Sequence, residues 1–356
     1  MARYDLSRLS ILVAEDSAFM LKLFTGILQA LGIERITTCD NGEEAIRVLS
    51  PIDDSSGPTV GMTGVDMILC DRFMPVVDGA MFLRWLRRSE KSPDRFLPVV
   101  MVSAGADIDV LFETRDAGVD EFLAKPFSAN AVVSRIAAVI ETPRPYIYCP
   151  TYFGPDRRRK ATAVQKERRV ISDDEIEVMH SGKSLPSTRN KKKRVWIFKL
   201  HRHLKAKLTT GNGDAGEPLF DPELIAAAEA KIAEMESDYS DWVQDSIAEM
   251  DKAHSAMVED PSVSEQNMET IHRVALELRG QGGIFGYPLM TQFGKSLYET
   301  TSADPDPTSK RLSLIEAHID LIKVVVKQKI KGDGGETGRD LLQSLAQAKK
   351  KFSAGH

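Results

Sequence analysis

The sequence of 356 residues has little cysteine and no long apolar run. Its three cysteines are far apart and form no Cys-x-x-Cys pair, so we expect free thiols rather than a disulfide framework or a zinc site. No apolar run approaches the roughly 18 to 20 residues that a membrane span needs. The apolar run that follows the N-terminal MARYDLSRLS is too short for a signal peptide. We therefore expect a cytoplasmic protein without a membrane span.

The net charge of −5 hides an uneven distribution of charge along the chain. Residues 1–149 include 15 basic and 21 acidic residues, residues 150–207 include 17 and 6, and residues 208–356 include 15 and 25. Two acidic segments therefore flank a basic one. Since a domain has about 150 residues, the length allows two domains joined by a linker.

Residues 7–141 alternate short apolar runs with amphipathic stretches, which is the pattern of repeated βα units. Strands are expected at 9–14, 35–39, 66–70, 97–102 and 120–123. Helices are expected at 17–31, 42–49, 79–89, 107–117 and 128–141, with an inserted loop at 51–64. Strands this short and apolar are typical of a covered parallel sheet, so we predict an α/β domain with a doubly wound, five-stranded parallel sheet.

Residues 142–220 have no periodicity and contain many prolines and basic residues, which predicts a basic, largely disordered linker. Its one apolar patch, VWIFKLHRHL at 195–204, can form a short strand or helix or dock on a neighbour. The positive charge with Trp196 and Phe198 would suit binding to nucleic acid or to an anionic membrane. We favour a tether between the acidic domains, because no helix-turn-helix is evident and an acidic C-terminal domain repels phosphate backbones.

Residues 221–352 show helical periodicity and predict an all-α helical bundle. Asp221 is a suitable N-cap with Pro222 in the first helical position, and one apolar stripe then runs from Ile225 to Trp242. Further helices are expected at 263–281, 288–300, 309–331 and 338–350. Ser262 and Glu265 fit a capping box at the start of the first of these.

Polar side chains of the first domain follow the carboxyl ends of the predicted strands, where parallel sheets bind ligands. Glu15 and Asp16 follow the first strand, and Asp71 closes the third. Ser103 closes the fourth strand, and Lys125 follows the fifth. Three carboxylates that meet repel one another and require a cation, and a donor set of oxygen atoms suits Mg²⁺. A lysine and a hydroxyl beside them can hold a phosphoryl group.

These residues lie in motifs that resemble the receiver domain of two-component response regulators. The motifs are ED at 15–16, ILCDRFMPVVDG around Asp71, MVSAG around Ser103 and EFLAKPF around Lys125, in the family's order and spacing over residues 9–141. The resemblance implies a flavodoxin-like fold, Mg²⁺ as the metal, and a sensor histidine kinase or phosphotransfer protein as phosphate donor. It further implies an output by binding to a downstream protein rather than by enzymatic catalysis, and a homodimer is compatible with it.

The resemblance implies that Asp71 is the phosphoacceptor. Glu15, Asp16 and Asp71 then bind Mg²⁺ together with the backbone carbonyl of Phe73. A carboxylate in this role attacks the phosphorus of a phosphoramidate, and positioning provides most of the catalysis. The alternative for Glu15 and Asp16 is that they only cap the first helix.

Three further residues receive a role from the same resemblance. Lys125 pairs with the phosphoryl oxygens, Ser103 is the switch hydroxyl, and Phe122 is the switch aromatic. The alternatives are an ordinary loop serine at 103 and a core phenylalanine at 122.

The segment IHRVALELRGQGGIFG at 271–286 resembles the histidine-containing phosphotransfer domain. Leu276 stands where that family has its phosphoacceptor histidine and has no nucleophilic atom, so the resemblance implies a degenerate domain. Helix geometry places Leu276 away from the core stripe, and we expect it to be exposed. The stripe consists of Met268, Ile271, Ala275 and Leu278.

The possible docking face of this bundle consists of Leu276, Arg279, Gly280 and Gly283. An apolar centre framed by small residues is common at interfaces. The alternative is a phosphotransferase that uses His272, one turn before Leu276, as a non-standard acceptor. We favour a response regulator of a phosphorelay whose bundle binds without transferring phosphate.

Overall fold

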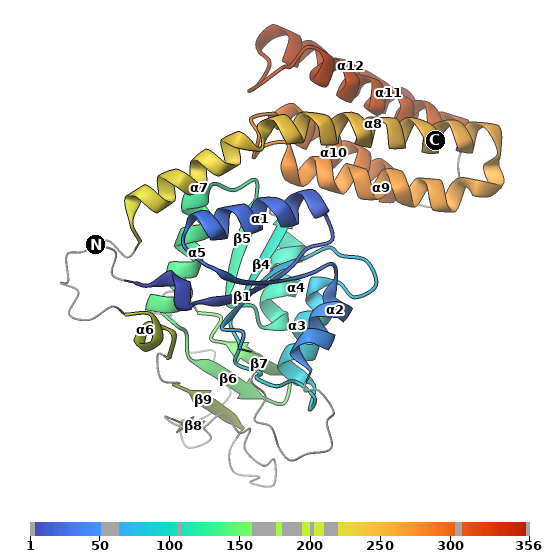
Figure 1. The fold of residues 1–356 in the computed structure, drawn as a ribbon. Helices are drawn as coiled ribbons and strands as arrows, with labels where there is room; N and C mark the ends of the chain where they lie inside the picture. The colour runs from blue at the N-terminus through green and yellow to red at the C-terminus, as the bar shows by residue number, and fades with distance from the viewer. Residues whose placement is uncertain are drawn as a thin grey trace, which may run out of the picture. The chain divides into compact units, whose positions relative to one another are not determined.

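A computed structural model of the chain describes residues 4–50, 64–104, 108–158, 176–179, 194–199, 203–209, 220–302 and 308–353 (Figure 1). Of residues 108–110 it describes only the backbone, and most of the loop predicted at 51–64 lies outside the described residues. The chain divides into two compact units, one of Met1–Leu123 with Ala129–Glu229 and the other of Ala124–Ser128 with Ala230–His356, so that one boundary falls within a helix.

The first unit contains the predicted parallel sheet, apart from the last two residues of its fifth strand. Its strands are β1 (Ser10–Ala14), β2 (Arg35–Cys39), β3 (Met67–Asp71), β4 (Val99–Ala104) and β5 (Glu121–Lys125), in the order β2-β1-β3-β4-β5. β1 pairs in parallel with β2 and β3, and β3 pairs in parallel with β4. Every residue of β3 and β4 is buried, which explains their continuous apolar runs. The predicted doubly wound, five-stranded sheet is confirmed.

Five helices cover this sheet: α1 (Ala18–Ala30), α2 (Gly42–Leu49), α3 (Gly79–Arg88), α4 (Ile108–Ala117) and α5 (Ala129–Glu141). Figure 1 shows α1 and α5 on one side of the sheet and α2, α3 and α4 on the other. Ser17, Asn41 and Asp78 are the N-caps of α1, α2 and α3, and each side chain accepts a hydrogen bond from a backbone N–H group of the first turn. The predicted bounds of these strands and helices are correct to within two residues.

A second sheet lies in the region predicted as a largely disordered linker. Its strands are β6 (Tyr146–Cys149), β7 (Tyr152–Pro155), β8 (Ile176–Met179) and β9 (Val195–Phe198), in the order β7-β6-β9-β8, and the short helix α6 (His203–Leu208) follows. β6 is antiparallel to β7 and β9, whereas β8 is parallel to β9. The predicted disorder of 142–220 is wrong for β6, β7 and β8, whereas β9 lies in the patch 195–204 that was expected to form a short strand or helix. The stretches 159–175, 180–193, 200–202 and 210–219 lie outside the described residues.

Aromatic packing attaches the second sheet to the first. Phe96, which precedes β4, packs against Tyr146, Phe153 and Phe198 with ring centroids 5.1 to 5.2 Å apart. These rings and Trp196 are buried and form one cluster. Burial of large aromatic side chains stabilises strands of only four residues that local sequence alone would not hold.

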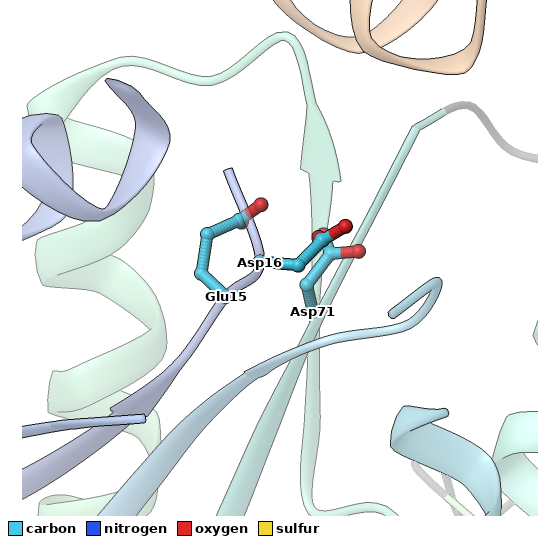
Figure 2. Close-up of side chains that lie close together, drawn as sticks. All are labelled: Glu15, Asp16 and Asp71. Atoms are coloured by element: carbon cyan, nitrogen blue, oxygen red, sulfur yellow. The ribbon is translucent and has the colours of Figure 1, made fainter. Parts of the chain in front are cut away.

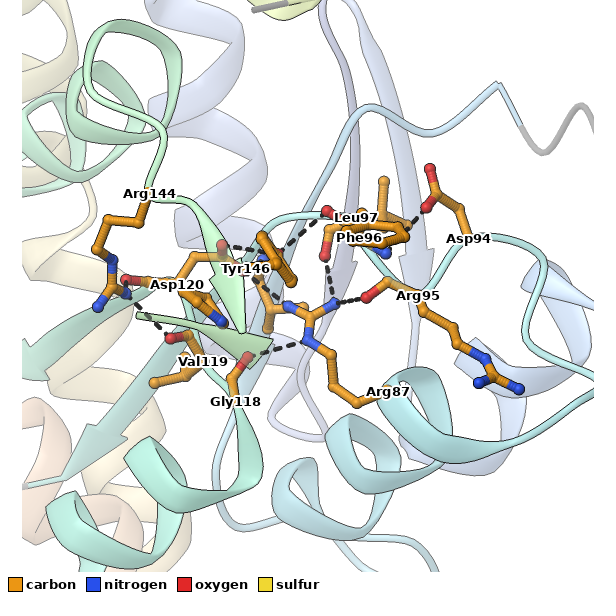
Figure 3. A network of polar contacts seen from close by, with 12 residues as sticks. Arg87, Asp94, Arg95, Phe96, Leu97, Gly118, Val119, Asp120, Arg144 and Tyr146 are labelled. Carbon is orange, nitrogen blue, oxygen red and sulfur yellow. Dashed lines mark hydrogen bonds and ion pairs between the residues drawn. The ribbon is translucent and has the colours of Figure 1, made fainter. Parts of the chain in front are cut away.

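A buried polar network reinforces this attachment (Figure 3). The guanidinium of Arg87 in α3 donates to three backbone carbonyl oxygens and forms an ion pair with Asp120. The hydroxyl of Tyr146 in β6 donates to the other oxygen of the same carboxylate, at 2.8 Å. Arg144 donates to the backbone carbonyls of Val119 and Asp120. Strand β6 is therefore bonded to the segment that leads into β5.

Basic side chains of the predicted linker pair with acidic side chains of the α/β domain. The ion pairs are Lys205 with Glu141 at 2.6 Å, Lys207 with Asp66 at 2.5 Å and Arg157 with Asp116 at 3.1 Å. Part of the positive charge of this segment is thus used within the chain, as the tether interpretation expects.

The C-terminal part of the chain is helical, as predicted. Its elements are α7 (Pro222–Glu234), which spans the division between the units, α8 (Glu236–Glu259), the 3₁₀ turn η3 (Pro261–Val263), α9 (Ser264–Gln281), α10 (Pro288–Ser302), α11 (Ser309–Lys327) and α12 (Gly335–Ser353). α8 packs against α9 and α11, α10 also packs against α9 and α11, and α12 packs against α11. The predicted core stripe of α9 is buried. Among the described residues, no helix is long and apolar enough to cross a membrane.

The predicted stripe from Ile225 to Trp242 is buried at Ala228, Ile232, Met235 and Tyr239, and it runs over two helices, α7 and α8, which separate at Met235. The expected capping box does not form, because the N-cap of α9 is Val263, which makes no side-chain capping hydrogen bond. Asp260 caps the preceding turn η3, where its side chain accepts a hydrogen bond from the N–H of Ser262.

Candidate functional site

Three carboxylates meet at the carboxyl edge of the parallel sheet (Figure 2). Glu15 and Asp16 follow β1, and Asp71 is the last residue of β3. Because β1 and β3 are neighbouring parallel strands, their ends bring these side chains together, and one oxygen of each lies within 4.8 Å of the others. Glu15 and Asp71 are buried, and Asp16 is half-buried. The predicted cluster therefore exists.

The surrounding backbone holds Asp71 in one orientation. Its Oδ2 accepts a hydrogen bond from the N–H of Phe73 at 2.8 Å. A Cβ atom on Gly79 would lie 2.1 Å from the carbonyl oxygen of Asp71, so only glycine lets α3 begin this close to the site. A carboxylate fixed in this way needs little reorganisation to react.

The donor set fits Mg²⁺. Carboxylate oxygens are the ligands that this hard cation prefers, and three clustered negative charges require a positive one. The helix-cap alternative for Glu15 and Asp16 finds no support, because Ser17 caps α1 and accepts the hydrogen bond from Met20 N–H.

The remaining predicted residues lie in β4 and β5. Ser103 is fully buried near the end of β4, and its hydroxyl has no hydrogen-bond partner within the part of the chain that the structure describes. Lys125 is the buried last residue of β5. Phe122, near the start of β5, is half-buried and packs against the core.

Sequence reasoning missed Arg72, the residue after Asp71. Its guanidinium is buried and forms ion pairs with Asp78 and Glu113, at 2.9 and 2.8 Å. Arginine is usually exposed, and the motif CDRFMP gives no sign that this one is not. The pairing acids come from α3 and α4, so only the tertiary fold reveals the contact.

The predicted docking face of the bundle is less open than expected. Leu276 was expected to be exposed, but it is half-buried on α9, as is Gly283, while Arg279 and Gly280 are buried. The guanidinium of Arg279 lies 5.6 Å from the ring centroid of Tyr298 in α10. The close packing of α9 and α10 explains part of this burial, because Gly294 lies against the backbone of α9.

His272 is held by α10. Its Nδ1 lies 2.8 Å from the hydroxyl oxygen of Thr301, and its ring stacks on Tyr298 with centroids 4.2 Å apart. Burial lowers the pKa of His272 below its ordinary value. These contacts are those of a packed side chain.

Comparison with known proteins assigns the α/β domain to a class. Residues 11–137 match the response regulator receiver domain family. This segment is therefore a receiver domain of two-component signalling, as its motifs predict.

Several proteins of known role are similar to this part of the chain. Chemotaxis protein CheY of Pseudomonas aeruginosa is 29% identical over 133 residues, which are 37% of this chain and 97% of that protein. Chemotaxis protein CheY-3 of Vibrio cholerae is 26% identical over 133 residues, 37% of this chain and 92% of that protein. Histidine kinase CKI1 of Arabidopsis thaliana is 33% identical over 129 residues, 35% of this chain but only 11% of the kinase.

Solved structures give the same kind of match. The receiver domain of the histidine kinase CKI1 from Arabidopsis thaliana, complexed with Mg²⁺, is 29% identical and covers 39% of this chain and 94% of its own, with a TM-score of 0.32. The receiver domain of a sensor histidine kinase from Pseudomonas aeruginosa, with a magnesium ion in its active-site cleft, is 28% identical and covers 36% and 94%, with a TM-score of 0.30.

Proposed function

We propose that the receiver domain accepts a phosphoryl group on Asp71 and that the protein is a response regulator of a two-component phosphorelay. The observation that carries this proposal is the cluster of Glu15, Asp16 and Asp71 at the carboxyl edge of a receiver sheet. The donor is a sensor histidine kinase or a phosphotransfer protein, and the output is a changed affinity for a downstream protein in the cytoplasm.

The chemistry needs one nucleophile and one metal site. An oxygen of Asp71 attacks the phosphorus of a phosphohistidine, the P–N bond breaks, and its electron pair remains on the imidazole nitrogen. Glu15 and Asp16, with Asp71 and the carbonyl of Phe73, hold the metal. Mg²⁺, when bound, neutralises the negative charge of the phosphoryl oxygens.

Lys125 and Ser103 then respond to the new acyl phosphate. The ammonium of Lys125 pairs with a phosphoryl oxygen, and the hydroxyl of Ser103 donates to another. The buried hydroxyl of Ser103, which has no partner among the described residues, supports this role because an unsatisfied buried donor is costly. Phe122 is the aromatic side chain that moves with this rearrangement.

The bundle is proposed to bind a receiver domain through the face of α9 around Leu276. Leucine cannot accept phosphate, so this face can dock a receiver or compete for it without carrying the phosphoryl group onward. A histidine kinase's dimerisation helices are the second possible occupant. The contacts of His272 with Thr301 and Tyr298 disfavour a phosphotransferase that uses His272.

Phosphate labelling of the full chain tests the central proposal. Acetyl phosphate with Mg²⁺ should label the parent protein and leave Asp71→Asn unlabelled, because Asn keeps the shape of the side chain but removes the nucleophile. Asp116→Asn, an exposed acid of α4, is the matched control and should label like the parent. Labelling of Asp71→Asn, or equal labelling of the parent in a metal chelator, would refute the assignment.

A further inference from the structure

We propose that Arg72 is a positioning residue that couples the state of Asp71 to the position of helix α4. The inference rests on the proposed phosphorylation of Asp71 and adds a residue that the motif resemblance does not assign. Its support is a set of contacts that join the backbone of the site to α3 and α4.

Arg72 bridges two helices from a buried position. Its side chain is only 6% exposed, and its two terminal nitrogens lie 2.9 Å from Asp78 Oδ2 and 2.8 Å from Glu113 Oε2. Asp78 is the N-cap of α3, and Glu113 lies in α4. Burial by itself lowers the pKa of Arg72, but the two carboxylates outweigh it and raise the pKa above its ordinary value. The group is a permanent cation between the helices.

The backbone of Arg72 belongs to the same hydrogen-bonded turn as the carboxylate of Asp71. The N–H of Arg72 donates to Val102 in β4 at 2.8 Å, and its carbonyl accepts from Gly79 at 3.1 Å. The next N–H, that of Phe73, donates to Asp71 Oδ2. An acyl phosphate on Asp71 changes the charge on this carboxylate and the bond that Phe73 makes. It therefore acts on the turn from which the Arg72 side chain projects.

Glu113 is the point at which this change reaches α4. It is shared between the buried Arg72 and Arg84 of α3, whose side chain is 49% exposed and lies 2.5 Å from Glu113 Oε1. Exposed pairs contribute little, whereas pairs removed from water contribute more. A shift of the turn that holds Arg72 moves its guanidinium away from Glu113 and releases α4. The Nε of Arg72 is buried and has no acceptor among the described residues. The hydrogen bonds of the guanidinium are therefore incomplete in this conformation, and a second conformation of the side chain can compete with it.

Hydrogen exchange of α4 amides in the full chain tests this coupling. The parent, Glu113→Gln, Arg72→Gln and Arg84→Gln are each compared with and without acetyl phosphate and Mg²⁺. In the parent, phosphorylation should speed exchange in α4 by about fivefold or more. Glu113→Gln and Arg72→Gln should take up phosphate and show no such change, while Arg84→Gln, which removes the exposed partner of the same carboxylate, should respond like the parent.

The outcomes separate this inference from the proposed function. No labelling of the parent refutes phosphorylation of Asp71. Labelling without any change in α4, an undiminished change in Glu113→Gln, or an equal loss in Arg84→Gln refutes the role of Arg72. Glu113 is half-exposed, so its variant should fold even if the loss of buried Arg72 prevents folding, and the comparison with Arg84→Gln then decides.

Discussion

Nη2 of Arg87 lies 2.8 Å from Oδ2 of Asp120, in a buried ion pair between α3 and the residue that precedes β5. Tyr146 of the second sheet bonds to the other oxygen of this carboxylate. We expect Asp120→Asn to lower the free energy of unfolding by about 3 to 5 kcal/mol, because Arg87 then keeps a buried charge without its partner. Tyr146→Phe removes the hydroxyl that contacts Asp120 and the carbonyl of Phe96 and should cost about 1 kcal/mol. Urea denaturation of the full chain measures both.

The control for this prediction is Arg157→Gln. Arg157 pairs with Asp116 at the surface of the same unit, and exposed pairs contribute at most about 1 kcal/mol. A loss for Asp120→Asn no larger than that for Arg157→Gln would mean that the Arg87 network does not anchor the second sheet.

Ser103 allows a test of the switch with a conservative variant. Ser103→Ala should still accept phosphate on Asp71 but show a weaker phosphorylation-dependent change in binding of the downstream partner, because no hydroxyl follows the phosphoryl group. Ser103→Thr keeps the hydroxyl and should retain more of the change than Ser103→Ala. Labelling combined with a partner-binding assay measures the two steps separately. Full partner response in Ser103→Ala would exclude the switch role.

Leu276 separates docking from phosphotransfer in the bundle. Leu276→Asp should weaken binding of a receiver domain by about 1 to 3 kcal/mol, since it places an unpaired charge in a desolvated contact. The helical circular dichroism of the variant should match that of the parent. Leu276→His supplies the missing nucleophile and should accept phosphate from a phosphorylated receiver. Normal receiver binding by Leu276→Asp and no labelling of Leu276→His would together show that the resemblance is one of bundle shape alone.

His318 should make the stability of the bundle depend on pH. Its Nδ1 donates to the carbonyl of Leu314 at 2.7 Å, which leaves Nε2 to accept from the hydroxyl of Ser296 at 2.9 Å in a neutral ring. Burial lowers the pKa of His318 below its ordinary 6.5. The unfolded chain therefore binds a proton at His318 more readily than the folded chain does. The contribution of His318 to the free energy of unfolding is fully present above about pH 6.5 and is lost as the pH falls below that value.

The size and origin of this effect can be measured by urea denaturation between pH 5 and 7. The contribution of His318 to the slope should be at most about 1.4 kcal/mol per pH unit, and His318→Gln should remove it. Ser296→Ala is the matched control, because it deletes the hydrogen bond but keeps the titrating ring, so the pH dependence should persist at lower stability. Equal slopes in the parent and His318→Gln would exclude the histidine as the cause.

The receiver sheet could be predicted from the sequence because its signals are local and redundant. Every strand except β2 (RITTC) contains a short apolar run, each of the first three helices begins at a capping side chain, and the acids of the site lie at the ends of strands. The order of the parallel strands then brings Glu15 and Asp71 together without any further information. The same reasoning identified the core stripe of α9, which is buried as expected.

Most of the second sheet could not be predicted in the same way, and only β9 lies in a patch, 195–204, where a short strand or helix was expected. Its strands have four residues each, too few to show an alternating pattern, and β7 ends in Pro155, which reads as loop. They are stable because Tyr146 packs its ring against Phe96 and donates a hydrogen bond to Asp120, and both residues are distant from it in sequence. The role of Arg72 could not be predicted for the same reason. Its acidic partners are the N-cap of α3 and a residue of α4, which are distant in sequence from each other.

Tyr4 pairs with Thr209, and the N–H of Asp5 donates to the carbonyl of Leu208 at 2.9 Å. The two ends of the segment 4–209 thus lie side by side, although the first unit continues to Glu229. A segment of this kind can be inserted into a loop of another protein, or circularly permuted, without a gap to span. Residues 4–209 could be placed between the two halves of a split fluorescent protein. Because the ends of the segment are neighbours, a rearrangement within it would alter both junctions at the same place, which is the geometry that a genetically encoded sensor requires.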